Sequence, residues 1–244
     1  MSIPILNYHQ ISKVPSKHFS WRSLHVDVES FDFQMRFLKN LGYVGRSIRD
    51  LMPYLRGDIN GRVFGITFDD GYANNLYNAL PILSKHNFTA TCYFVSQKLG
   101  STNSWDKDLN AVESPLMKRD ELLKWHDSGN EVGSHTRHHN KLTSLTFYNA
   151  RNEISDSKRD LEQIIGEPVD SFCYPYGSYF DEHTDIVNKS GYKSAVTTVR
   201  GKYSVGSDLF QIKRIPITCY TTGFHFALKM FTGYEDHKGK KTGL

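Results

Sequence analysis

The chain has 244 residues, a formal net charge of +4, 39% hydrophobic residues and a mean hydropathy of −0.50. This composition excludes an integral membrane protein, because no apolar run approaches the roughly 20 residues that a spanning helix needs, and the mild charge excludes a strongly basic nucleic-acid-binding surface. The three cysteines, Cys92, Cys173 and Cys219, are scattered, which predicts reduced thiols rather than a disulfide framework or a cysteine-rich metal site.

Strand-like apolar segments alternate with amphipathic helical ones along the chain, which is the pattern of a parallel α/β barrel. We predict strands at residues 3–8, 63–68, 89–95, 131–135, 171–174, 194–198 and 211–217. We predict helices at residues 29–41, 73–86, 118–128, 145–165 and 182–190. Residues 1–233 are expected to form one barrel domain, and residues 234–244 a polar, mobile tail.

Two adjacent carboxylates, Asp69 and Asp70, stand where the strand predicted at residues 63–68 gives way to Gly71. Neighbouring aspartates at a strand end repel one another unless a positive group holds one of them. A divalent metal ion would do so, and would leave the other Asp free as a base. Taken alone, an Asp-Asp-Gly sequence after a strand is most often a simple turn.

A histidine pair, His135 and His139, follows the strand predicted at residues 131–135. The two are four residues apart, so one helical turn would place both imidazoles on the same side, with His138 as an alternative second ligand. Alone, such pairs are often surface or capping residues. One Asp and two His at strand ends nevertheless favour a metal site, and they leave positions open for water as in hydrolytic sites.

Other candidate residues also follow predicted strands. His9 comes directly after the first strand, and a Pro-Tyr-Gly turn containing Tyr176 follows the strand at residues 171–174. Barrel enzymes build their active sites at the carboxyl ends of their strands. The positions of these residues therefore agree with a single site, although a lone His after a strand is by itself most simply a structural imidazole.

Three of these elements, in this order, resemble the polysaccharide deacetylase family, also called carbohydrate esterase family 4 or the NodB-homology domain. The matching stretches read TFDDG at residues 67–71, HTRHH at 135–139 and FCYPYG at 172–177. Residues 8–11 and 31–43 resemble the subgroup that deacetylates poly-N-acetylglucosamine-type polymers. The resemblance implies a single distorted (β/α)7-type barrel, circularly permuted relative to the commoner members.

The resemblance also implies a role for each matching residue. Asp69 would be the general base, the metal ligands would be Asp70, His135 and His139, and the backbone N–H of Tyr176 would help to bind the oxyanion. Imidazole ligands favour Zn²⁺, with Co²⁺ or Ni²⁺ as alternatives, over Mg²⁺.

Three assignments depart from the commoner family pattern or leave an alternative open. In the permuted subgroup the general-acid motif moves to the N-terminus, which assigns His9, with His225 as the alternative. The third motif has Cys173 where the family often has an Arg that orients the base. Arg214 is therefore expected to replace that Arg, or else to be a solvated strand residue. Trp105, in the irregular segment 99–116, is expected to stack on a sugar ring or to anchor its loop.

We therefore predict a metal-dependent hydrolase that removes the N-acetyl group of an amino sugar in an oligo- or polysaccharide, or in its lipid-linked precursor, releasing acetate. The alternatives are a deformylase of a formamido sugar on a lipid carrier and an inactive carbohydrate-binding barrel. The expected partner is an N-acylated amino-sugar glycan, with no nucleic acid. Contact with a membrane surface would come through a lipid-linked substrate.

The location and the assembly of the protein are less constrained by sequence. No signal peptide is visible, which predicts a cytoplasmic enzyme provided that Met1 is the native start. Residues 224–231 are expected to pack on the barrel rather than to enter a membrane interface. The oligomeric state stays open.

Overall fold

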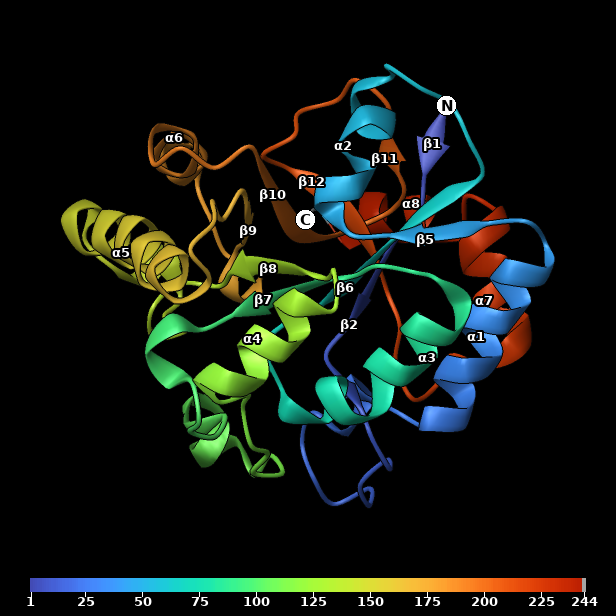
Figure 1. The fold of residues 1–244 in the computed structure, drawn as a ribbon, viewed down its shortest axis with the longest axis horizontal. Coiled ribbons are helices and arrows are strands. Elements are labelled where there is room, and N and C mark those ends of the chain that lie inside the picture. Colours follow the sequence, from blue (N-terminus) through green and yellow to red (C-terminus); the bar gives the residue numbers. More distant parts are fainter. Residues whose placement is uncertain (243–244) are drawn as a thin grey trace.

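A computed structural model describes residues 1–242, and within these residues seven parallel strands form a closed ring with helices around it (Figure 1). In order around the ring the strands are β2 (Ile5–Tyr8), β12 (Ile212–Pro216), β10 (Ser194–Arg200), β9 (Ser171–Cys173), β8 (Glu131–Ser134), β7 (Thr91–Phe94) and β6 (Val63–Phe68). The ring closes because β6 also pairs with β2. The predicted seven-stranded α/β barrel is confirmed.

Short strands supplement the ring. They are β5 (Val44–Arg46), which pairs with β6 outside the ring, β1 (Ser2–Ile3) with β11 (Tyr203–Ser204), and β3 (Gln10–Ile11) with β4 (His25–Val26). Pro4 separates β1 from β2, because proline has no N–H to donate to a strand ladder. The strand predicted at residues 3–8 is therefore two strands.

The helices are α1 (Val28–Asn40), α2 (Ile48–Arg56), α3 (Leu80–His86), α4 (Arg119–Asp127), α5 (Phe147–Ile165), α6 (Asp181–Lys189), α7 (Gly223–Phe231) and α8 (Tyr234–Thr242). Among the described residues, no helix has the length and apolar character needed to cross a membrane. Helix α2 was not predicted, because Pro53 lies inside it and proline normally breaks a helix. The Ser47 cap, which accepts the Asp50 N–H, and the left-handed Gly57 were the available signals.

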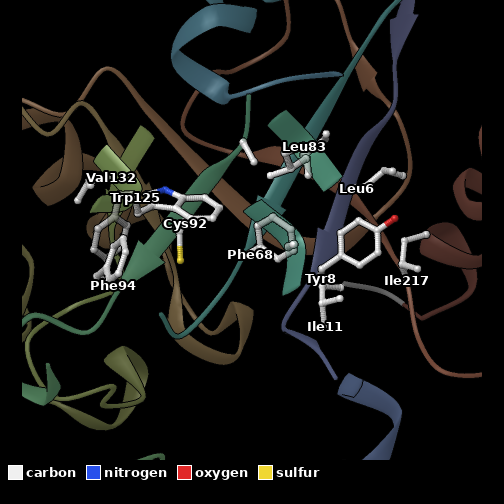
Figure 2. Close-up of a cluster of buried hydrophobic side chains, with 14 of the residues drawn as sticks. Leu6, Tyr8, Ile11, Phe68, Leu83, Cys92, Phe94, Trp125, Val132 and Ile217 are labelled. Atoms are coloured by element: carbon white, nitrogen blue, oxygen red, sulfur yellow. The ribbon is translucent and has the colours of Figure 1, made fainter. Parts of the chain in front are cut away.

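The main core lies between the ring and the helices. All residues of β2 and β6 are buried, because one face of each strand points into the ring and the other toward the helices. Tyr8 and Phe68 come from these neighbouring strands, and their rings lie 5.6 Å apart in the cluster shown in Figure 2. Trp125 of α4 meets Phe68 edge to face at 5.9 Å. Residues that alternate with this core face, such as Asn7, are left to line the inside of the ring.

The C-terminal segment is helical over residues 234–242, within the stretch predicted as a polar tail. Helix α8 packs against β10, and its Glu235 is fully buried. The Glu235 carboxylate pairs with Lys229 of α7 and with Arg200 of β10, whose Nε lies 2.6 Å from Glu235 Oε2. These ion pairs fix a helix whose polar sequence gave no apolar periodicity. Residues 243–244 of the predicted tail lie outside the described residues.

A buried carboxylate at the amino end of β8 predicts a pH dependence of stability. Glu131 accepts hydrogen bonds from the Thr91 hydroxyl (2.6 Å) and the Arg49 N–H (2.7 Å), and burial raises its pKa from 4.5 to about 7. Because the pKa of Glu131 is higher in the folded than in the unfolded protein, proton binding by Glu131 stabilises the fold. This stabilisation is fully present below about pH 4.5 and is lost as the pH rises through about 7.

We therefore expect Glu131→Gln to flatten the pH dependence of the free energy of unfolding between about pH 4.5 and 7. The contribution removed is on the order of 3 kcal/mol, from about 1.4 kcal/mol per pKa unit. Urea denaturation of both proteins across this range is the measurement. Parallel curves for the wild type and the variant would contradict the assignment.

Candidate active site

A cavity of about 340 Å³ lies at the carboxyl ends of the ring strands. Its lining consists of Asn7, His9, Trp21, Leu24, Asp69, Asp70, Trp105, Asp106, His135, His139, Tyr174, Tyr176, Thr198, Arg214 and Pro216. Every residue assigned a site role from the sequence is therefore in one cavity. The reason is topological: all seven ring strands are parallel, so segments that follow different strands meet at one end of the barrel.

One carboxylate and two imidazoles converge in this cavity. Asp70 Oδ1 lies 3.3 Å from His135 Nε2 and 3.2 Å from His139 Nε2, and the three side chains are buried. Their ligand atoms all lie within 4.8 Å of one another. Two imidazole nitrogens and one carboxylate oxygen suit a divalent transition metal and leave a coordination position open. The donor set therefore fits the metal ion that the sequence predicted.

Hydrogen bonds behind the two imidazoles orient them. His135 Nδ1 donates to the Cys173 carbonyl at 2.7 Å, and His139 Nδ1 lies 3.1 Å from the Tyr176 hydroxyl. With each Nδ1 engaged, the two Nε2 atoms are the ones directed at Asp70, which is the usual arrangement behind metal-binding histidines. Burial by itself would raise the pKa of Asp70, but the two histidines outweigh burial and hold that pKa well below its usual range.

The segment joining the two histidines is a loop, so the expected helical turn is wrong although the convergence is present. Thr136 and His139 have φ values of 64° and 63°, and Thr136 Oγ1 accepts the His139 N–H. Glu153 of α5 accepts the N–H groups of Arg137 and His138, both at 3.0 Å, and contacts His138 Nδ1 at 2.6 Å. His138 is thereby held on Glu153, and His139 is the residue that reaches the cavity.

The second aspartate of the pair, Asp69, is held by Arg214. Arg214 Nη1 and Nη2 donate to the two Asp69 carboxylate oxygens at 2.7 and 2.8 Å, and both side chains are buried. The alternative that Arg214 is a solvated strand residue is therefore wrong. Burial by itself would raise the pKa of Asp69, but the Arg214 charge and hydrogen bonds outweigh it and lower that pKa. Cys173 Sγ lies only 3.4 Å from Arg214 Nη2, so its small side chain leaves room for the guanidinium.

His9 lies beside this pair, with Nε2 3.9 Å from Asp69 Oδ2 and its side chain 21% exposed. Asn75 fixes the backbone around it, because Asn75 Nδ2 donates to the His9 carbonyl and Asn75 Oδ1 accepts the Ile11 N–H. Asn75 begins a π-helical turn, Asn75–Ala79, where the sequence predicted a regular helix. Pro81, at the start of α3, has no N–H to donate backward, which breaks the regular hydrogen-bond pattern there.

The alternative histidine, His225, lies elsewhere. It is exposed near the N-terminus of α7, where its backbone N–H donates to Thr222 Oγ1, and it does not line the cavity. Of the two candidate acids, the structure brings only His9 near Asp69.

Aromatic side chains complete the cavity. The Trp105 ring stacks on the His139 imidazole with centroids 4.3 Å apart, and the Tyr176 ring meets His139 at 4.6 Å. Trp105 thus packs against a proposed metal ligand. Trp21, 46% exposed, and Asp106 also line the cavity and were missed in the sequence. Burial and the nearby Asp70 charge raise the pKa of Asp106 to about 6.

Fold and site together define a class of protein: an α/β barrel hydrolase whose acidic and imidazole side chains gather at the carboxyl ends of its strands. The chain belongs to the polysaccharide deacetylase family, whose sequence model matches residues 56–195. Enzymes of this family are hydrolases acting on amide C–N bonds. The matched region contains Asp69, Asp70 and both proposed histidine ligands, whereas His9 and Arg214 lie outside it.

Individual relatives agree with this assignment. YxkH of Bacillus subtilis (strain 168), named for the same family, is 27% identical over 226 residues, which are 92% of this chain and 74% of that protein. A poly-β-1,6-N-acetyl-D-glucosamine N-deacetylase of Staphylococcus aureus (strain MRSA252) is 22% identical over 250 residues, 95% of this chain and 83% of that protein. The crystal structure of BC0361, a polysaccharide deacetylase from Bacillus cereus, superposes with a TM-score of 0.79 at 31% identity, covering 94% of this chain and 69% of that one. The circular permutation relative to commoner family members stays a prediction.

Proposed function

We propose that this protein is a metal-dependent N-deacetylase of an amino-sugar glycan, and that Zn²⁺ is the preferred metal. The observation that carries the proposal is the convergence of Asp70, His135 and His139 beside an Asp69 carboxylate held by Arg214. The name of the Staphylococcus aureus relative, a poly-β-1,6-N-acetyl-D-glucosamine N-deacetylase, supports an N-acetylated glycan as substrate. A complete set of acidic and imidazole groups argues against an inactive binding barrel.

The proposed chemistry assigns each side chain one task. A divalent ion held by Asp70 and the two histidines would supply Lewis-acid polarisation of the acetamide carbonyl. Asp69, kept ionised and oriented by Arg214, takes a proton from the attacking water. The backbone N–H of Tyr176 would donate to the oxyanion. His9 gives a proton to the nitrogen as the C–N bond breaks, so the products are acetate and a free amino sugar.

The cavity mouth supports a sugar as the group that carries the acetamide. Trp21 and Tyr176 are 46% and 47% exposed and line the cavity, and aromatic rings offer apolar faces with polar edges, which suits sugar rings. Trp105 has one face on His139, so its proposed role is to form the wall behind the ligand rather than a free stacking platform.

Mass spectrometry of glycan products tests the proposed function directly. The protein, stripped of metal and then reloaded separately with Zn²⁺, Co²⁺, Ni²⁺ or Mg²⁺, is incubated with β-1,6-linked N-acetylglucosamine oligomers and with a formamido-sugar substrate. We expect the products to have lost the mass of an acetyl group. This activity should be absent from the metal-stripped protein and restored by the transition metals. Loss of formyl groups alone would favour the deformylase alternative. No metal-restored product from either substrate would contradict the proposal.

The role of His9 predicts a substrate-dependent loss of rate. His9→Ala should lower kcat on an N-acetyl sugar by about 10²–10⁴-fold, because an amine leaves poorly without a proton. An activated aryl acetate has a good leaving group and should lose much less. His225→Ala is the matched control and should change neither rate. Equal losses on the amide and the ester after His9→Ala would show a structural rather than an acidic role.

A further inference from the structure

The segment that carries His9 is hydrogen-bonded to the segment that begins with Asp69. The Asp69 N–H donates to the Tyr8 carbonyl at 3.0 Å. Further along, Asn75 Nδ2 donates to the His9 carbonyl at 2.7 Å, and Asn75 Oδ1 accepts the Ile11 N–H at 3.2 Å. One buried amide side chain therefore holds the two peptide groups that directly follow the proposed general acid.

Other amides of the π-helical turn Asn75–Ala79 and its cap bind the same segment. Asn74 Nδ2 donates to the Gln10 side-chain oxygen at 2.8 Å, and Asn78 Nδ2 donates to the Ile11 carbonyl at 2.8 Å. Asparagine is a poor helix former that is favoured at helix caps, yet the Asn74 side chain makes no capping hydrogen bond here. These amides are therefore directed at the segment that follows β2 rather than at their own helix.

Among residues 1–242, no hydrogen bond holds the imidazole of His9 itself. His9 Nε2 lies 3.9 Å from Asp69 Oδ2, which is beyond hydrogen-bond distance, and neither ring nitrogen has a closer polar partner in this part of the chain. A histidine that transfers a proton is often oriented by a hydrogen bond to its other ring nitrogen. Because His9 lacks one, its backbone sets where the imidazole lies, and Asn75 fixes that backbone.

We propose that Asn75 is a positioning residue whose hydrogen bonds keep the His9 imidazole within reach of the departing nitrogen. This inference rests on the proposed N-deacetylase function. As the C–N bond breaks, the proton of His9 moves to the nitrogen and leaves the imidazole neutral. The transfer needs the donor within hydrogen-bond distance, and a displacement of about 1 Å can cost about 100-fold in rate. Asp69 keeps its own support from Arg214, so loss of Asn75 acts on the proton donor.

Kinetics on two substrates test this role. For Asn75→Ala we expect kcat on an N-acetyl sugar to fall by about 10- to 100-fold with KM little changed, because His9 acts in the transition state. An activated aryl acetate needs no proton on its leaving group and should lose much less. In a protein that already carries His9→Ala, adding Asn75→Ala should cost no further rate on the amide. Asn78→Ala removes a hydrogen bond of the same turn to Ile11 and is the matched control, with both rates nearly unchanged.

A measurement without substrate separates this inference from the proposed function. The NMR order parameters of the His9 and Gln10 backbone amides should fall from about 0.85 to below about 0.6 in Asn75→Ala, and stay high in Asn78→Ala. Melting temperature and metal content are measured for each variant, and Asn75→Leu, which keeps the side-chain volume, serves if Asn75→Ala does not fold.

Three results would overturn the role of Asn75 alone: equal losses on amide and ester, a further loss in the His9→Ala protein, or unchanged order parameters. A wild-type enzyme that hydrolyses the ester and no N-acetyl substrate would overturn the N-deacetylase function. The order parameters would then still decide whether Asn75 fixes His9.

Discussion

Asp69→Asn should lower turnover by about 10²–10⁴-fold, the usual contribution of a general base, while the metal stays bound. The reason is geometric: Asp69 is held by Arg214 and is not one of the three proposed ligands, Asp70, His135 and His139. An Asn side chain keeps the shape and one acceptor oxygen but cannot take a proton. Steady-state kinetics and metal analysis of the same sample provide the measurement. Turnover close to the wild-type value would remove Asp69 from the mechanism.

The same substitution also affects stability, and the experiment must allow for it. Arg214 is fully buried, so the neutral amide leaves its charge without a full counter-charge. Breaking a buried ion pair in this way costs about 3–5 kcal/mol. Rates are therefore compared below the melting temperature of both proteins. Asp32→Asn is a suitable control, because Asp32 pairs with exposed side chains of Arg36 and Lys85, and it should change neither turnover nor metal content.

The second large predicted effect is on metal binding, and it should distinguish His139 from its neighbour His138. His139→Ala removes a proposed metal ligand and should weaken metal binding by more than about 100-fold, because loss of even an outer partner of a ligand costs about 10–100-fold. The His138→Ala variant should retain the metal, since the His138 imidazole of the wild type contacts Glu153. Metal content after dialysis, followed by competition with a chelating dye, measures both. The reverse pattern would assign the ligand role to His138.

The sequence was sufficient to predict the position of the site, because strand ends in a barrel lie at a common edge. Strand β6 occupies the predicted residues 63–68, and Asp69 and Asp70 follow it directly. The predicted strand at residues 131–135 ends one residue early, as β8, which still leaves His135 at the edge. Burial of both faces makes such strands continuous apolar runs, and these are easily found.

Side-chain partners that are distant in sequence could not be predicted in this way. Which of His138 and His139 reaches the cavity depends on the left-handed backbone conformations of Thr136 and His139. It also depends on Glu153 of α5, which holds His138. The pairing of Arg214 with Asp69 joins residues 145 positions apart, and nothing in either local sequence specifies it. Asn7 lies on β2 two residues before His9, and alternation along an extended segment places such residues on one side, so Asn7 is a missed cavity residue that the sequence could have indicated.

Because β2 closes the ring, the proposed active site needs residues from both the first and the last strand of the barrel. Strand β2 pairs with both β6 and β12, so the first and last strands of the ring are neighbours. His9 follows one and Arg214 belongs to the other. During synthesis, Asp69 therefore emerges long before the arginine that keeps it ionised. A nascent or truncated chain that ends before β12 contains all three proposed metal ligands but lacks the arginine that holds the proposed base. We therefore expect hydrolysis only from chains in which the two ends of the barrel have met.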